Sequence, residues 1–229
     1  MLRILWIFIF MFNVIFPPVA QAARDNGPGT TSSQASGFVS ASQFLPHESA
    51  HDGQLTPWQS MTDRLADERT RFQGQCKEYG DFCLPLAWEE HIQKMRGMPL
   101  TARLDYANRL INQYHYAVDM QVYGVKNYWS TPLELATQKR GDCKDHAIAK
   151  FALLLASGVP EKAMRVLVLH NTRDHYLHAI LMASTDRGLF YLDDQKTKLL
   201  TPRDVPYYQP IYSINFDGWW LHENRMASL

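Results

Sequence analysis

A cysteine at the start of a predicted helix is the feature that most constrains how this chain can fold. Asp142 is a natural N-cap for a helix that begins at Cys143, carries a broad apolar face and ends at Gly158 and Pro160. After Pro160 the apolar spacing changes from helical to alternating, which predicts strands. These strands cover residues 164–170, 176–182, 189–193 and 211–216, and turns short enough for antiparallel hairpins join the first three.

The half of the chain before this helix is predicted to be largely helical. Residues 57–96 show helical spacing with a loop around 83–85, and a further helix is expected from Thr101 to about Val122. Thr131 is a cap for a short helix that opens at Pro132. The predicted fold class is therefore α+β, with a helical N-terminal half and the cysteine helix packed on an antiparallel sheet.

The N-terminus has the pattern of an export signal. Residues 1–22 contain Arg3, an apolar run over 4–16 and a small-x-small cleavage site that ends at Ala22. The run is shorter than a membrane span requires, so an uncleaved anchor is the weaker alternative. We expect a signal peptide over 1–22, a flexible tail over 23–50, where polar residues dominate, and one domain over 51–229.

Three cysteines in an exported protein leave one without a partner. Cys76 and Cys83 flank a turn-like segment, Tyr79-Gly-Asp, and are the expected disulfide in an oxidising compartment. Cys143 would then be a free thiol at a helix N-terminus, where unpaired N–H groups and the helix dipole favour a thiolate. The alternative for Cys143 alone is a small core residue.

A histidine and an aspartate follow the cysteine on neighbouring predicted strands. His178 shares a strand face with Ile180 and Met182 and could point toward the cysteine helix, while Asp193 ends the next strand. A Cys-His-Asp triad needs these three groups, because the imidazole must reach the sulfur and the carboxylate must orient the imidazole. The alternatives are a histidine satisfied within the core, and Asp194 in place of Asp193.

The charge balance gives no sign of a nucleic-acid partner. Lysine plus arginine and aspartate plus glutamate both number 23, so the formal net charge is zero. A zinc site at Cys143 is disfavoured because no second ligand lies close to it in a C-x-x-C type pattern.

Four segments in order carry a family resemblance. They are Tyr128-Trp-Ser-Thr-Pro-Leu-Glu, Gly141-Asp-Cys-Lys-Asp-His-Ala-Ile-Ala-Lys, the strand His178-Ala-Ile-Leu and Leu192-Asp-Asp. Over residues 88–194 the chain resembles the bacterial transglutaminase-like cysteine proteinases, the family of the LapG-type periplasmic proteases. The resemblance implies a papain/transglutaminase-like fold and a catalytic triad of Cys143, His178 and Asp193.

The resemblance also implies a biological role. LapG-type proteases cleave a large surface adhesin near its N-terminus after paired alanines, which releases the adhesin and disperses biofilm. An inner-membrane cyclic-di-GMP receptor sequesters the protease through a surface that includes the tryptophan matched by Trp129. Trp129 could instead wall the substrate cleft, or be a core tryptophan of the helical half. The resemblance thus predicts a periplasmic endopeptidase.

One residue departs from the family pattern beside the cysteine. In LapG-type members, acidic residues on both sides of the cysteine ligate a calcium ion required for activity. This chain keeps Asp142 and Asp145, but Lys144 directly follows Cys143, and an ammonium repels Ca²⁺. Calcium binding by Asp142 and Asp145 is one expectation, and replacement of the ion by the Lys144 charge is the other.

Two other functions use the same residues. A transglutaminase has the same triad but transfers the acyl group to an amine, and a non-catalytic binding protein could retain the fold. For proteolysis, the Cys143 backbone N–H is the natural first oxyanion donor, with Gln138 and Trp129 as candidates for the second.

Overall fold

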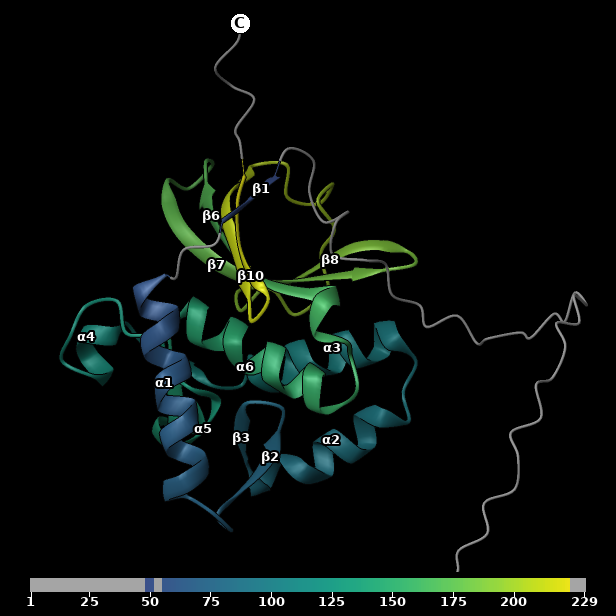
Figure 1. Ribbon diagram of the computed structural model, residues 1–229. Coiled ribbons are helices and arrows are strands. Elements are labelled where there is room, and N and C mark those ends of the chain that lie inside the picture. Colours follow the sequence, from purple (N-terminus) through teal and green to yellow (C-terminus); the bar gives the residue numbers. More distant parts are fainter. Residues whose placement is uncertain (1–47, 52–54, 223–229) are drawn as a thin grey trace, which may run out of the picture. The chain divides into compact units, whose positions relative to one another are not determined.

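A six-stranded antiparallel sheet and a group of helices make up the described part of the chain (Figure 1). The computed structural model describes residues 48–51 and 55–222. The sheet has the order β1-β10-β9-β6-β7-β8. Its strands are β1 (Glu48–His51), β6 (Met164–Asn171), β7 (Tyr176–Thr185), β8 (Gly188–Leu192), β9 (Tyr208–Asn215) and β10 (Gly218–His222).

The central hairpin of the sheet joins the strand that carries His178 to its neighbours. β6 and β7 pair over their full length, with Leu169 opposite His178, and β7 pairs with β8 from Leu181 opposite Leu192 to the turn at Gly188. Asp193 follows β8 directly. The register therefore brings the end of β8 to the middle of β7, so that Asp193 follows on the same side as the first half of β7, where His178 lies.

Helix α6 (Cys143–Ala156) packs against the sheet and forms the centre of the larger hydrophobic cluster. In this helix all residues other than Cys143 and Leu155 are buried. The apolar residues of this helix lie mainly in its C-terminal part, where Leu153 and Leu154 are fully buried. Truncating either leucine to alanine would cost about 2–5 kcal/mol, the usual range for large buried aliphatic residues.

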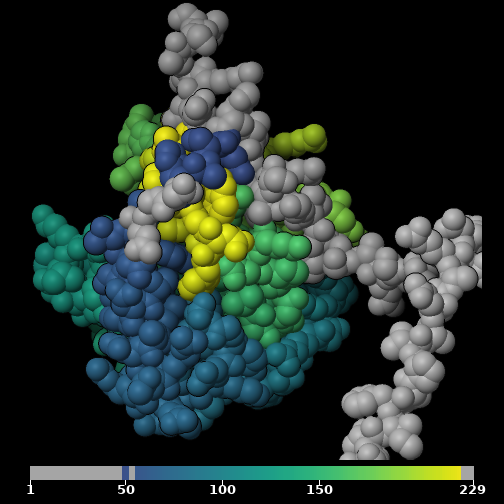
Figure 2. All heavy atoms as spheres, viewed as in Figure 1, coloured from purple at the N-terminus to yellow at the C-terminus, as the bar shows by residue number. Residues whose placement is uncertain are grey.

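The other helices surround α6. They are α1 (Thr56–Arg71), α2 (Glu89–Arg96), α3 (Leu100–Ile111), α4 (Asp119–Val122) and α5 (Pro132–Gln138). Thr131 caps α5 with a complete capping box to Glu134, as the sequence predicts. Figure 1 shows these helices on one side of the sheet, and Figure 2 shows β1 in dark blue against β10 in yellow, where Ala50 is opposite Trp220.

Two helical predictions are wrong. Residues 76–85 form a hairpin of β2 (Cys76–Tyr79) and β3 (Phe82–Pro85), so the expected loop at 83–85 is a strand. Gly80 has φ +59° in its turn, which lets the chain reverse. The second helix ends at Ile111 rather than Val122, because the chain turns into β4 (His115–Tyr116), which pairs in parallel with β5 (Arg140–Gly141) beside the cysteine.

The predicted N-terminal regions lie mostly outside the described residues. This applies to the signal peptide over 1–22 and to residues 23–47 of the predicted tail, while residues 48–50 belong to β1. In the described ranges, no helix combines the length and apolar character that a membrane crossing requires.

The disulfide prediction is confirmed. Cys76 and Cys83 are joined, and Cys143 is free and half-buried. The bond spans the β2–β3 hairpin, which places Phe82 and Leu84 in the larger cluster.

Candidate active site

Cys143 is the first residue of α6, held there by a capping box. The Asp142 carboxylate accepts a hydrogen bond from the Lys144 backbone N–H at 3.2 Å, and Asp145 accepts one from the Asp142 backbone N–H at 3.0 Å. The Cys143 backbone N–H is among the helix donors without an intrahelical partner. The nucleophile candidate therefore sits at the positive end of a rigid, buried helix.

Gly141 allows this close packing at the helix start. A Cβ on Gly141 would lie 2.7 Å from Leu135 Cδ1 and 2.8 Å from an oxygen of Asp145. Any side chain here would displace the carboxylate that caps the helix. The lack of space for a side chain thus explains why a glycine precedes the Asp142-Cys143 pair.

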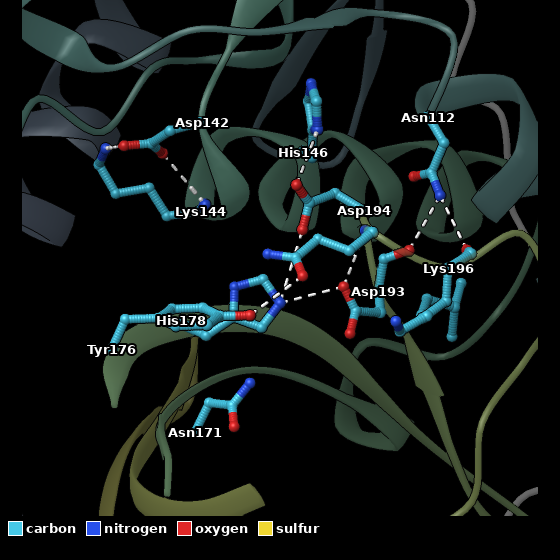
Figure 3. Close-up of polar contacts among 12 residues, drawn as sticks. Asn112, Asp142, Lys144, His146, Asn171, Tyr176, His178, Asp193, Asp194 and Lys196 are labelled. Atoms are coloured by element: carbon cyan, nitrogen blue, oxygen red, sulfur yellow. Dashed lines mark hydrogen bonds and ion pairs between the residues drawn. The ribbon is translucent and has the colours of Figure 1, made fainter. Parts of the chain in front are cut away.

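His178 connects the cysteine to Asp193. Its Nε2 lies 3.0 Å from Oδ1 of Asp193 (Figure 3). Its ring also interacts with Cys143. Because Nε2 faces the carboxylate, Nδ1 is the nitrogen available to the sulfur. The histidine and the aspartate are 2% and 0% exposed, so water does not compete for this contact.

The electrostatics favour a charged histidine and aspartate. Burial alone would lower the pKa of His178, but hydrogen bonds to Asp193 and Cys143 outweigh it and raise the pKa to about 10. Burial alone would raise the pKa of Asp193, but hydrogen bonds from His178 and Tyr208 bring it below its usual range. The pair is an imidazolium and a carboxylate at neutral pH.

The expected strand face differs from the observed one. Ile180 and Met182 pack in a second hydrophobic cluster, whereas Leu181 and Ala183 share the cluster of α6. The prediction that the Ile180 face points toward the helix is wrong. His178 nevertheless interacts with Cys143, at the N-terminal end of α6.

Two residues that the sequence did not indicate hold Asp193 in place. The Tyr208 hydroxyl donates to Asp193 Oδ2 at 2.6 Å. The Asn112 side chain donates to the Asp193 backbone carbonyl at 2.9 Å (Figure 3). Asn108 of α3 and Asn112, which caps the C-terminus of that helix, both donate to the Lys196 carbonyl. The spacing of the two asparagines, four residues apart, could have indicated them from the sequence, whereas no sequence signal indicated Tyr208.

Asp194, the competitor for Asp193, lies slightly farther from the ring. Its Oδ1 is 3.6 Å from His178 Nε2, and its other oxygen is 3.9 Å from His146 Nδ1 (Figure 3). Burial raises the pKa of Asp194 to about 6 and lowers that of His146 to about 3. The shorter distance and the better hydrogen bond favour Asp193 as the partner of His178.

Lys150 is a further buried polar residue near Asp193 and Asp194. It is completely buried, its Nζ lies 3.5 Å from the Leu192 carbonyl, and burial lowers its pKa to about 7. Asp193, Asp194 and Cys143 interact with its charge. A buried cation near these carboxylates partly offsets the cost of their burial.

Trp129 is in the core rather than on a binding surface. It is 4% exposed, packs edge-on against Trp58 with ring centroids 6.1 Å apart, and donates its indole N–H to Asn127. The core alternative therefore describes Trp129, and its ring is not presented to a substrate or regulator. Because its N–H is taken, Trp129 is also unsuited as an oxyanion donor, and Gln138 lines a cavity that Cys143 does not line.

Three carboxylates beside Cys143 form a cluster of the kind that can hold a metal ion. Ligand oxygens of Asp119, Asp142 and Asp145 all lie within 4.8 Å of one another. Lys144 joins them, with its ammonium bonded to Asp119 and to Asp142. Burial alone would lower the pKa of Lys144, but the surrounding carboxylates raise it, so the lysine is charged. The sequence did not indicate Asp119 as a member of this cluster, because the chain around it departs from the single helix predicted from Thr101 to about Val122.

The family follows from the sequence profile. A profile described as bacterial transglutaminase-like cysteine proteinase BTLCP matches residues 63–222. This chain belongs to that family. It is a cysteine protease with the transglutaminase-like fold that the sequence predicts.

Solved structures of a family member resemble this protease. LapG of Legionella pneumophila in its EGTA-treated form is 27% identical, with a TM-score of 0.56 over 72% of this chain and 87% of that chain. The calcium-bound form of LapG is 26% identical, with a TM-score of 0.54 over 73% and 93%. Comparison with curated protein sequences gives no significant match. The calcium-bound form shows that a relative of this protease binds Ca²⁺, and the three carboxylates here are oxygen ligands of the kind that the calcium prediction requires. The Lys144 ammonium already occupies two of them.

Proposed function

We propose that the protease is an exported endopeptidase in which Cys143, His178 and Asp193 form the catalytic triad. The observation that carries this proposal is the His178 imidazole, which interacts with Cys143 and hydrogen bonds to the buried Asp193 through Nε2. This is the arrangement that a cysteine nucleophile and its base require.

The proposed reaction begins with attack of the Cys143 thiolate on a peptide carbonyl carbon. The tetrahedral intermediate collapses when imidazolium His178 gives its proton to the leaving amine, and the C–N bond breaks. A thioester of Cys143 is left. Neutral His178 then takes a proton from water, the hydroxide adds to the thioester carbonyl, and the acid product leaves as the thiolate returns. Asp193 keeps the ring oriented throughout.

The proposed substrate is a large surface adhesin, cut near its N-terminus at a dialanine site so that biofilm is released. Resemblance to the LapG-type proteases supports this substrate. Tyr116 adds a steric reason, because it is 59% exposed and pairs with Gly141, two residues before Cys143. A ring beside the nucleophile favours small residues at the scissile bond.

We also propose where the protease acts and how it is regulated. Export by residues 1–22 would place the protease in the periplasm, where the Cys76–Cys83 disulfide forms. There an inner-membrane cyclic-di-GMP receptor would sequester it. The core position of Trp129 means that such a receptor would have to contact neighbouring exposed residues instead.

Asp119, Asp142 and Asp145 are the residues that would hold a calcium ion in this protease. A calcium ion needs six to eight oxygen ligands, and these carboxylates are of the right chemistry. With the Lys144 ammonium in its observed place, however, the ion does not fit. None of the reaction steps above uses the metal.

The test uses the mature protein and an adhesin N-terminal fragment with a dialanine site. Natural protein should cut it once, whereas Cys143→Ser and a fragment with the alanines changed to arginine should give no product. A lysine-rich amine donor in the same assay separates the alternatives. Incorporation of the amine without hydrolysis would identify a transglutaminase and refute the proposal, and absence of both reactions would indicate a binding protein.

A further inference from the structure

Lys144 occupies the middle of the acidic cluster. Its side chain is 9% exposed, and its ammonium lies 2.8 Å from Asp119 Oδ2 and also contacts Asp142. These contacts join the loop that carries α4 to the start of α6, which are 25 residues apart in sequence. Figure 3 shows the Lys144 side chain curving back to the Asp142 carboxylate.

The oxygens of the cluster are nearly all engaged by N–H donors. Asp145 accepts from the backbone of Ser130 and of Asp142, and Asp142 accepts from Lys144 through both of its oxygens. Asp119 Oδ2 accepts from Tyr128 as well as from the ammonium. Within the described residues, Asp119 Oδ1 is the one carboxylate oxygen of the cluster without a partner.

Such a cluster does not fit a calcium ion as it stands. Calcium takes 6–8 oxygen ligands, and here the space between Asp119 and Asp142 is filled by nitrogen. An ammonium also has no acceptor capacity and repels the ion. Calcium and the Lys144 ammonium therefore compete for the same oxygens.

The charge of this cluster acts on the nucleophile. Three carboxylates, of which those of Asp119 and Asp145 are buried, would repel one another without a cation and disfavour the adjacent thiolate. Any cation at this place offsets that repulsion, whether it is a metal ion or an ammonium. An ammonium fixed by two carboxylates also holds the helix start in position without a ligand from solution.

We propose that the Lys144 ammonium is the resident cation of the cluster of Asp119, Asp142 and Asp145, and that it makes this protease independent of calcium. The expected effect of calcium on activity rests on the proposed function. The expected effect of calcium on stability does not, because the ammonium orders the cluster whatever reaction Cys143 performs.

The first measurement is made on the natural protein and on Cys143→Ser, with EGTA and with millimolar calcium. The melting temperature of both and the cleavage rate of the natural protein should be the same in the two conditions. A melting temperature that rises with calcium, or activity that is lost in EGTA and restored by calcium, would overturn the proposal. Lack of cleavage together with a calcium-insensitive melting temperature would refute only the proposed function.

The second measurement exchanges the ammonium for a ligand. In EGTA, Lys144→Glu should lower the melting temperature by about 5–10 °C, because it leaves buried carboxylates without their cation. Added calcium should restore it. Lys126→Glu is the control, since Lys126 is exposed and the change in net charge is the same; calcium should leave its melting temperature unchanged.

A third variant covers the case in which Lys144→Glu does not fold. Lys144→Gln removes the charge but adds none, so it should be less stable than the natural protein in EGTA and should gain stability from calcium. If Lys144→Gln matches the natural protein in both conditions, the ammonium is not the cation of this cluster.

Discussion

Replacing Asp193 by asparagine tests how the site controls the charge of His178. The substitution keeps the shape of the side chain but removes the negative charge 3.0 Å from Nε2. The natural protein has a His178 pKa of about 10, so the imidazolium needed to protonate the leaving amine persists into alkaline solution. We expect the alkaline limb of kcat/KM to lie well above the ordinary histidine value of about 6.5.

The expected shift follows from the strength of the lost hydrogen bond. A hydrogen bond to a charged group contributes about 1.5–3 kcal/mol, and one pKa unit corresponds to about 1.36 kcal/mol, so the limb should fall by about one to two units. The value of kcat/KM at pH 7 should fall by about 10²–10⁴-fold, because an unoriented ring is a poor acid and base.

Stability should follow the same titration. The pKa of His178 is raised in the folded state, so its contribution is fully present below pH 6.5 and is lost as pH rises through about 10. The melting temperature of the natural protein should therefore decline over this range, and that of Asp193→Asn should decline less.

The assay is a pH series of kcat/KM from pH 5 to pH 10.5, with melting curves in the same buffers. Asp194→Asn is the matched control, because the neighbouring carboxylate lies 3.6 Å from the same nitrogen, beyond a good hydrogen bond. Its limb should move less than that of Asp193→Asn. A natural limb near pH 6.5, or equal shifts in the two variants, would refute the assignment of Asp193.

Three further outcomes are expected. Tyr208→Phe removes the 2.6 Å hydrogen bond to Asp193, and should lower kcat/KM by about tenfold with little change in KM, as steady-state kinetics would show. Gly141→Ala should lower stability by about 1–3 kcal/mol in urea titration, because its methyl group meets Asp145 at 2.8 Å. Alkylation of the non-reduced protein should label Cys143 and spare Cys76 and Cys83, as mass spectrometry would detect.

Local signals in the sequence were sufficient to predict the elements that carry the proposed triad. The Asp142 cap places the start of α6 at Cys143, and alternation places His178 on β7 and Asp193 after β8. These features depend on neighbours within a few residues, or on pairing of adjacent strands. The same holds for the Cys76–Cys83 disulfide, although the hairpin around it lacks a strong strand pattern.

Features that depend on distant partners could not be predicted. The helix predicted to reach Val122 ends at Ile111, because residues 115–116 pair with residues 140–141 far along the chain. Asp119 then folds back onto Lys144, and Tyr208 reaches Asp193 from another strand. The spacing of residues within one segment does not predict contacts with distant segments.

Asn112 at the end of α3 means that the proposed triad depends on a residue outside the part of the chain that supplies its members. A fragment that begins at Pro132 would include Cys143, His178 and Asp193, together with most of the sheet. It would lack Asn112, whose side chain bonds the carbonyls of Asp193 and Lys196. The backbone that presents the acid would lose this anchor, so the fragment could hold every reactive group and still fail to align them. On the proposed assignment, the helical half is thus needed to align the catalytic groups and is not a removable accessory.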